Sequence, residues 1–123
     1  MESSDKILTR WRLATCLRTI LAKNKDIAVS NEIQGIENLS LIDSIRQLEA
    51  SSRLSYTIVQ GVFAAERDIQ FTSLMSLIED GLGLSLLEFA KIYASVSEED
   101  IKKTKKEVAT SKRKKAVSQK KEE

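Results

Sequence analysis

The chain has 123 residues, of which 41% are apolar, so it can build at most one modest hydrophobic core. It contains no histidine and one cysteine, which excludes histidine-based catalysis, an internal disulfide and a zinc site made of cysteine thiolates. The net charge of +2 is unevenly divided, because residues 1–101 hold 10 Lys/Arg against 15 Asp/Glu and residues 102–123 hold 10 Lys/Arg against 3 Glu.

The composition predicts an all-α protein. Proline is absent, glycine occurs four times, and strand-like alternation of apolar residues is hard to find. No apolar run reaches the length of a membrane span and no secretory leader is visible, so we expect a cytoplasmic protein without membrane contact. Glycine-rich phosphate loops are missing too, and we expect no enzyme activity, no cofactor and no metal.

The first predicted helix runs from Ile7 to about Lys25. Its apolar residues, among them Trp11, Leu17 and Leu21, recur at helical spacing. Residues 24–40 mix Asn, Ser and Gly with isolated apolar residues, which is typical of a loop. We therefore treat residues 1–39 as an N-terminal helix followed by a long loop.

Two short helices with a brief break between them are predicted next. Ser40 and Asp43 have the spacing of a capping box, and the helix that follows reaches about Ser51. After the break 52–54, Ser55 caps a helix that extends to about residue 65. Two packed helices joined so closely are the geometry that presents one helix to a DNA groove.

Two more helices complete the predicted core, which spans residues 40–95. One ends at Gly81-Leu82-Gly83, where glycine tolerates the left-handed residue that often terminates a helix. The other runs from Ser85 to about Ala94. Residues 96–123 form a lysine-rich tail, and we expect an exposed helix over 98–109 and disorder in the remainder.

The region 40–90 resembles the Xre/lambda-repressor-like helix-turn-helix family. Leu48 stands where that family has the packing leucine of its second helix, and Leu54-Ser55 match the residues that open the third helix. Val59 matches the buried β-branched residue, Arg67-Asp68 the polar pair after it, and Leu82-Gly83-Leu84-Ser85 the segment between the fourth and fifth helices. The resemblance implies a five-helix DNA-binding domain and, from family habit, a homodimer.

Several positions depart from the family pattern. Phe63 and Ile69 replace a glutamate and a proline, and Ile45 replaces a glutamine that bonds a phosphate. Arg53 and Ala65 stand where the family has glycines. A positive φ at such a position is unfavourable for any residue that has a Cβ atom.

The resemblance also implies which side chains read DNA. The bases would be contacted from the start of the helix 55–65 and one turn later, and Ser55 would lie near a phosphate. Gln60 can pair with adenine, and Thr57 can contact a thymine methyl group. The positions implied are Ser55, Tyr56, Thr57, Gln60 and Gly61.

Cations that could hold phosphates lie beside this helix and in the tail. Arg46, Arg53 and Arg67 flank the helix, but three acidic residues make the segment 44–70 neutral. In the tail, the run Lys112-Arg113-Lys114-Lys115 can displace counterions from double-stranded DNA without reading its sequence. A solubilising tail is the alternative interpretation of these lysines.

The sequence therefore predicts a transcriptional regulator that reads the major groove with the helix 55–65. The main alternative is a helical protein-interaction module, an antirepressor or adaptor, in which Ile45, Ile58, Val62 and Phe63 form an apolar patch instead of a DNA-reading face. A third interpretation is nonspecific nucleic-acid binding by the tail alone. Exposed apolar residues on the helix 55–65 would favour the protein partner.

Overall fold

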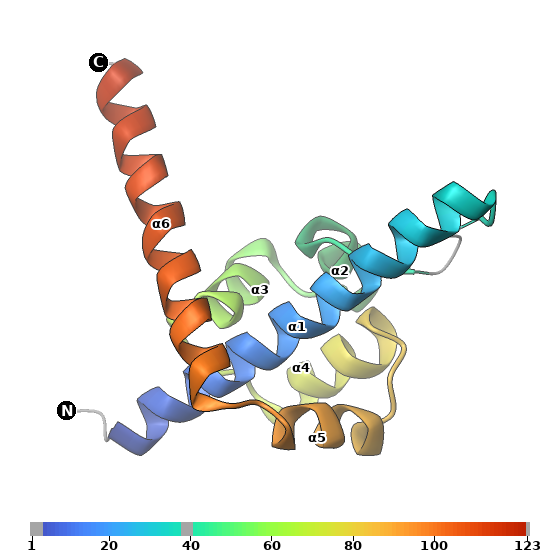
Figure 1. The fold of residues 1–123 in the computed structure, drawn as a ribbon. Coiled ribbons are helices and arrows are strands. Elements are labelled where there is room, and N and C mark those ends of the chain that lie inside the picture. Colours follow the sequence, from blue (N-terminus) through green and yellow to red (C-terminus); the bar gives the residue numbers. More distant parts are fainter. Residues whose placement is uncertain (1–3, 38–40, 123) are drawn as a thin grey trace.

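A computed structural model describes residues 4–37 and 41–122, and for residues 113–122 it describes the backbone alone. The described residues are helical and contain no strand, which confirms the expected all-α class (Figure 1). They form six α-helices and one π-helical segment, where five helices and an exposed sixth over 98–109 were expected. In chain order these are α1 (Ser4–Gln34), α2 (Ile45–Ser52), α3 (Tyr56–Phe63), α4 (Phe71–Met75), η1 (Ser76–Gly81), α5 (Leu86–Ala94) and α6 (Glu98–Glu122).

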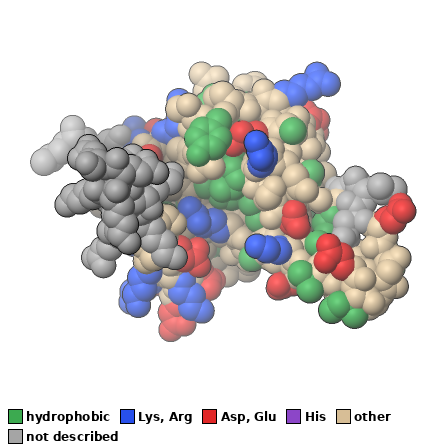
Figure 2. Space-filling model, turned by 90° about the horizontal axis from the view of Figure 1, so that it is seen from above, with side chains coloured by type: hydrophobic (Ala, Val, Ile, Leu, Met, Phe, Trp, Pro, Cys, Tyr) green, Lys and Arg blue, Asp and Glu red, His purple; other side chains and the backbone are tan. Residues whose placement is uncertain are grey.

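Ion pairs connect elements that are far apart in the sequence. Basic and acidic side chains are interspersed over the face seen in Figure 2, without a large area of one sign. Three pairs have N–O distances of 2.6, 3.7 and 2.8 Å, and they join Arg10 to Asp68, Arg18 to Glu107 and Lys112 to Glu66.

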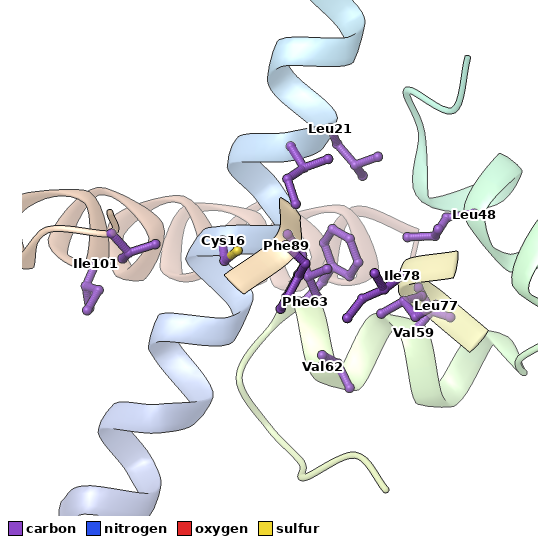
Figure 3. Close-up of a cluster of buried hydrophobic side chains, with 13 residues drawn as sticks. Cys16, Leu21, Leu48, Val59, Val62, Phe63, Leu77, Ile78, Phe89 and Ile101 are labelled. Atoms are coloured by element: carbon purple, nitrogen blue, oxygen red, sulfur yellow. The ribbon is translucent and has the colours of Figure 1, made fainter. Parts of the chain in front are cut away.

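The hydrophobic core lies where the middle of α1 crosses the other helices. Leu17 of α1, Leu48 of α2, Phe63 of α3 and the pair Leu77-Ile78 of η1 are each at most 1% exposed (Figure 3). These side chains come from four elements, so burying them packs α3 against α1 and α2 against η1 and α3.

Helix α1 continues nine residues beyond Lys25, where the sequence predicts that it ends, and residues 26–34 are therefore helix and not loop. It stops at Gly35, which has a φ of 74°, and the N–H of Ile36 donates to the carbonyl of Asn31 at 2.7 Å. This is the glycine-terminated end that helices commonly use. Gly35 marks the true end, whereas the polar residues before it do not interrupt the helix.

Helix α2 begins later than predicted. Its cap is Ser44, whose Oγ accepts from the N–H of Gln47 at 3.2 Å, and Ser40 lies outside the described residues. Asn24 of α1 donates its side-chain N–H to the carbonyl of Ile42 at 2.8 Å. That hydrogen bond holds residue 42 outside the helix.

The helix expected over 98–109 is present, but it is not wholly exposed, and the expected disorder after it is wrong because the backbone stays helical to Glu122. Ile101, Thr104 and Val108 recur at helical spacing, and each is at most 6% exposed. The hydroxyl of Thr15 on α1 donates to that of Thr104 at 2.9 Å in the buried contact. Three inward side chains on one face are enough to dock a helix that is otherwise covered in lysine.

Candidate nucleic-acid interface

The connection between α2 and α3 is short and tightly constrained. Helix α2 ends at Ser52, and Arg53 then adopts a left-handed conformation with a φ of 63°. Ser55 caps α3, as predicted, because its Oγ accepts from the N–H of Ile58 at 3.3 Å. Three residues therefore reverse the chain between two helices of eight residues each.

The apolar residues of α3 point mainly into the core. Val59, Val62 and Phe63 are each 1% exposed, and Ile58 is half-buried. The first turn faces outward, since Ser55, Tyr56 and Thr57 are exposed and Tyr56 retains 59% of its accessible surface. Two of the four residues expected in an apolar patch, Val62 and Phe63, are thus removed from the surface.

Gly61 is buried beneath a side chain of the chain itself. A Cβ atom at this position would lie 2.5 Å from Cδ of Arg67. The close approach that this glycine permits is therefore that of Arg67, which corrects the expectation that Gly61 lies open to a base. Gln60 is half-buried and remains on the surface side of α3.

Helix α6 stands beside the outward face of α3 (Figure 1). Between them lies a groove of about 530 Å³. Tyr56, Thr57 and Gln60 form one side of it, and the α6 residues that line it are Val108, Ser111 and Lys112. One flank of α3 is thus walled by a cationic helix, while its first turn stays exposed.

Lys112 is engaged within the protein. Its Nζ lies 2.8 Å from Oε1 of Glu66, just after α3. The sequence predicts a cation that is free to bind DNA, whereas in the structure this cation is paired. Both side chains are more than half exposed, so solvent and a phosphate can compete for the pair. The side chains of Arg113, Lys114 and Lys115 lie outside the described part of α6.

The expected phosphate-binding arginines differ in their surroundings. Arg46 and Arg53 are exposed, and neither forms an ion pair with another described residue. Arg67 is also exposed, but its aliphatic stem covers Gly61. Arg53 in the turn before α3 and Arg46 in the first turn of α2 are therefore two exposed arginines without an ion pair to another described residue.

Arg18 fixes the far end of α3, a role that nothing in the sequence pattern indicates. Its Nε donates to the carbonyl of Phe63 at 2.9 Å, and its Nη1 lies 3.7 Å from Oε2 of Glu107 on α6. Burial lowers the pKa of Arg18, and the charge of Glu107 opposes that shift. A guanidinium at the C-terminal carbonyls of a helix stabilises its dipole, so α1, α3 and α6 are joined through one side chain.

Asp68 holds the segment after α3 against the start of α1. Nε of Arg10 donates to Oδ1 of Asp68 at 2.6 Å. This hydrogen bond lowers the pKa of the Asp68 carboxyl group. Asp68 is therefore an anion tied to Arg10, and it does not lie free beside α3.

The thiol of Cys16 is not exposed at the surface of the folded chain. The residue is fully buried, and its burial raises the pKa of the thiol to about 12. Among residues 4–37 and 41–112, whose side chains are described, there is no group of three metal-ligating side chains. None of the helices described here is both long enough and apolar enough to cross a membrane.

No family model, curated protein or solved structure matches the chain. The resemblance to the Xre/lambda-repressor-like family thus rests on the residues named above and stays a prediction.

Proposed function

We propose that the protein is a cytoplasmic, sequence-specific DNA-binding transcriptional regulator that inserts the first turn of α3 into the major groove. One observation carries the proposal. Helices α2 and α3 are joined by three residues, and α3 turns its apolar side chains inward while Tyr56 and Thr57 face outward. A short helix held by its apolar side, with polar side chains outward, is what groove reading requires.

The outward side chains have suitable chemistry for base edges and phosphates. The methyl group of Thr57 can contact the thymine methyl group, and its hydroxyl can donate to or accept from a base edge. The amide of Gln60 can pair with adenine. Ser55 uses an oxygen lone pair for its cap, so its O–H remains able to donate to a phosphate. Tyr56, more than half exposed, can donate its hydroxyl to the backbone or to a base.

Phosphate contacts come from both sides of the reading turn. Arg46 and Arg53 lie at α2 and the turn, and on the other flank α6 carries its basic run 112–115. Acidic residues surround the arginines, so the body of the protein attracts DNA weakly. In this proposal α6 supplies much of the affinity and α3 supplies the sequence preference.

The test is selection of bound duplexes from a random pool, followed by fluorescence anisotropy on the selected duplex. Thr57→Ala and Tyr56→Ala should each weaken binding to that duplex about tenfold, which corresponds to the loss of one good base contact. Their affinity for an unrelated duplex should stay the same.

Thr72→Ala and Phe71→Ala are the matched controls. Both residues are exposed at the start of α4, away from the α2–α3 turn, and Phe71 is 66% exposed. Equal affinity of the wild-type protein for every duplex in the pool would refute sequence reading. It would instead favour nonspecific binding through the tail.

A protein-interaction module is the second candidate, at a different surface from the one predicted. Phe71, Leu86 and Leu87 are exposed by 66, 45 and 67%. Leu86 also lines a groove of about 440 Å³ that Leu13, Ile69, Leu74, Phe89 and Tyr93 make largely apolar. Two results together would establish this candidate: the wild-type protein selects no duplex from the pool, and Leu87→Glu abolishes its binding to a protein partner.

A further inference from the structure

The last part of α1 projects away from the core. Leu21 is the last buried residue of the helix, and residues 22–34 extend past α2 (Figure 1). Within this segment only Asn24, Ala28 and Asn31 are half-buried, and their spacing places them on one side of the helix. That side faces the loop before α2, because Asn24 donates to the carbonyl of Ile42 at 2.8 Å.

The opposite side of the same segment carries exposed apolar residues. Val29 is 51% exposed and Ile33 is 82% exposed, and Ile36, just beyond the helix, is 50% exposed. Ala22 lies two turns before Val29 and is also exposed. We define the α1 strip as Ala22, Lys25, Val29, Glu32 and Ile33, which share one helix face at three- and four-residue steps, together with Ile36, which follows the end of the helix.

This projecting helix has little intrinsic stability of its own. Residues 27–31 read Ile-Ala-Val-Ser-Asn, in which only Ala28 is a strong helix former. Short helices are marginal in water unless they bury an apolar face. Here the apolar face is turned to solvent, so a partner that covers the α1 strip would stabilise the helix.

Charge and shape along the strip identify the partner. We propose that the α1 strip pairs antiparallel with the same strip of a second copy of this chain. A twofold axis close to Val29 brings Lys25 of each copy beside Glu32 of the other, because the two residues lie seven positions apart on the same flank. The same axis sets small Ala22 of one copy against bulky Ile33 and Ile36 of the other.

The α1 strip fits this partner better than other classes. One lysine and one glutamate make it neutral, which gives no attraction for a polyanion or an anionic membrane. Two crossed helical segments bury less surface than a standard permanent interface. We therefore expect a reversible dimer with a dissociation constant of about 10 µM to 1 mM.

Sedimentation equilibrium of the whole chain without DNA, from about 1 µM to about 1 mM, tests the interface. Ile33→Glu should weaken dimerisation at least tenfold, since it places a carboxylate in the apolar contact. Ile7→Glu is the matched control, because Ile7 is likewise an exposed isoleucine of α1, at 44%, but lies at the opposite end of the helix, and it should change nothing. A wild-type monomer over the whole range, or an unaffected Ile33→Glu dimer, would overturn the proposal.

Charge reversal tests the antiparallel register. Lys25→Glu alone and Glu32→Lys alone should each weaken dimerisation about tenfold, because each places like charges at both reciprocal contacts. An equimolar mixture of the two variants should recover dimers, since both contacts in the mixed dimer again join opposite charges. A mixture no better than the single variants would refute the antiparallel pairing. None of these measurements involves DNA, so their failure leaves the proposed function untouched.

Discussion

Arg53 and Ala65 both hold left-handed backbone conformations, with φ of 63° and 58°, on either side of α3. Such a conformation brings the Cβ atom close to the backbone, which costs a residue with a side chain about 1 kcal/mol or more. Both positions end a helix, and the N–H of Glu66 donates to the carbonyl of Gly61 at 2.8 Å across the second of them. Helix α3 is thus fixed by two strained turns.

Replacing Ala65 by glycine should relieve this strain. We expect Ala65→Gly to raise the free energy of unfolding by about 0.5–1 kcal/mol, measured by urea denaturation. Ala64→Gly is the control, because Ala64 has a φ of −95° and gains nothing from glycine, so it should be neutral or destabilising. A lower stability for Ala65→Gly would show that its methyl group makes a contact that outweighs the strain.

The buried thiol of Cys16 makes stability depend on alkaline pH. Its pKa is about 12 in the folded chain against an ordinary value of 9.0. The folded state therefore keeps the proton longer, so this contribution is complete below about pH 9 and is lost as pH rises from about 9 to 12. Between about pH 8 and pH 10.5 the free energy of unfolding should fall by on the order of 1–2 kcal/mol more for the wild-type protein than for Cys16→Ala. Equal losses in urea denaturation at the two pH values would contradict the burial argument.

At the scale of elements, α6 is an integral part of the core. The helix packs against α1, its Ile101 belongs to the core cluster and is 3% exposed, and Val108 is 6% exposed. Ile101→Ala should lower the free energy of unfolding by about 2–4 kcal/mol, because it removes buried apolar surface and leaves a cavity. Lys102→Ala, at the exposed neighbouring position, should change it by less than about 0.5 kcal/mol. Similar effects of the two substitutions in chemical denaturation would mean that α6 is not docked.

An element could be predicted well where its bounds are set by residues close together in the sequence, and poorly where they are set by contacts between distant residues. Ser55 was identifiable as a cap because its hydroxyl bonds an N–H three residues later. For α2, the spacing predicted a cap at Ser40, whereas the helix starts after Ser44, and the bond from distant Asn24 to the carbonyl of Ile42 accounts for the later start. For α6, Thr104 looks polar in the sequence, yet it is buried because Thr15 gives it a hydrogen-bond partner 89 residues away.

At the scale of the whole molecule, α6 joins the strongly basic end of the chain to the acidic body. Removing residues 113–123 deletes five cations and keeps the buried side chains of Ile101, Thr104 and Val108, so the fragment 1–112 should unfold at the same temperature as the full chain. Its DNA affinity should depend less on salt, with a log–log slope shallower by about 0.9 for each phosphate that the fragment no longer neutralises. An unchanged slope, measured by anisotropy across a salt series, would assign another role to these lysines and arginines.

The sequence by itself determined the helical class, the short break between α2 and α3, and the cap at Ser55. These features depend on composition and on residues within a turn or two of each other, which spacing alone reveals. Only the tertiary structure decided that α6 docks on α1 beside α3, that Arg67 covers Gly61, and that Arg18 holds the end of α3. Each of these contacts joins side chains through space, and their energies depend on burial and on distances that emerge only after the helices have packed together.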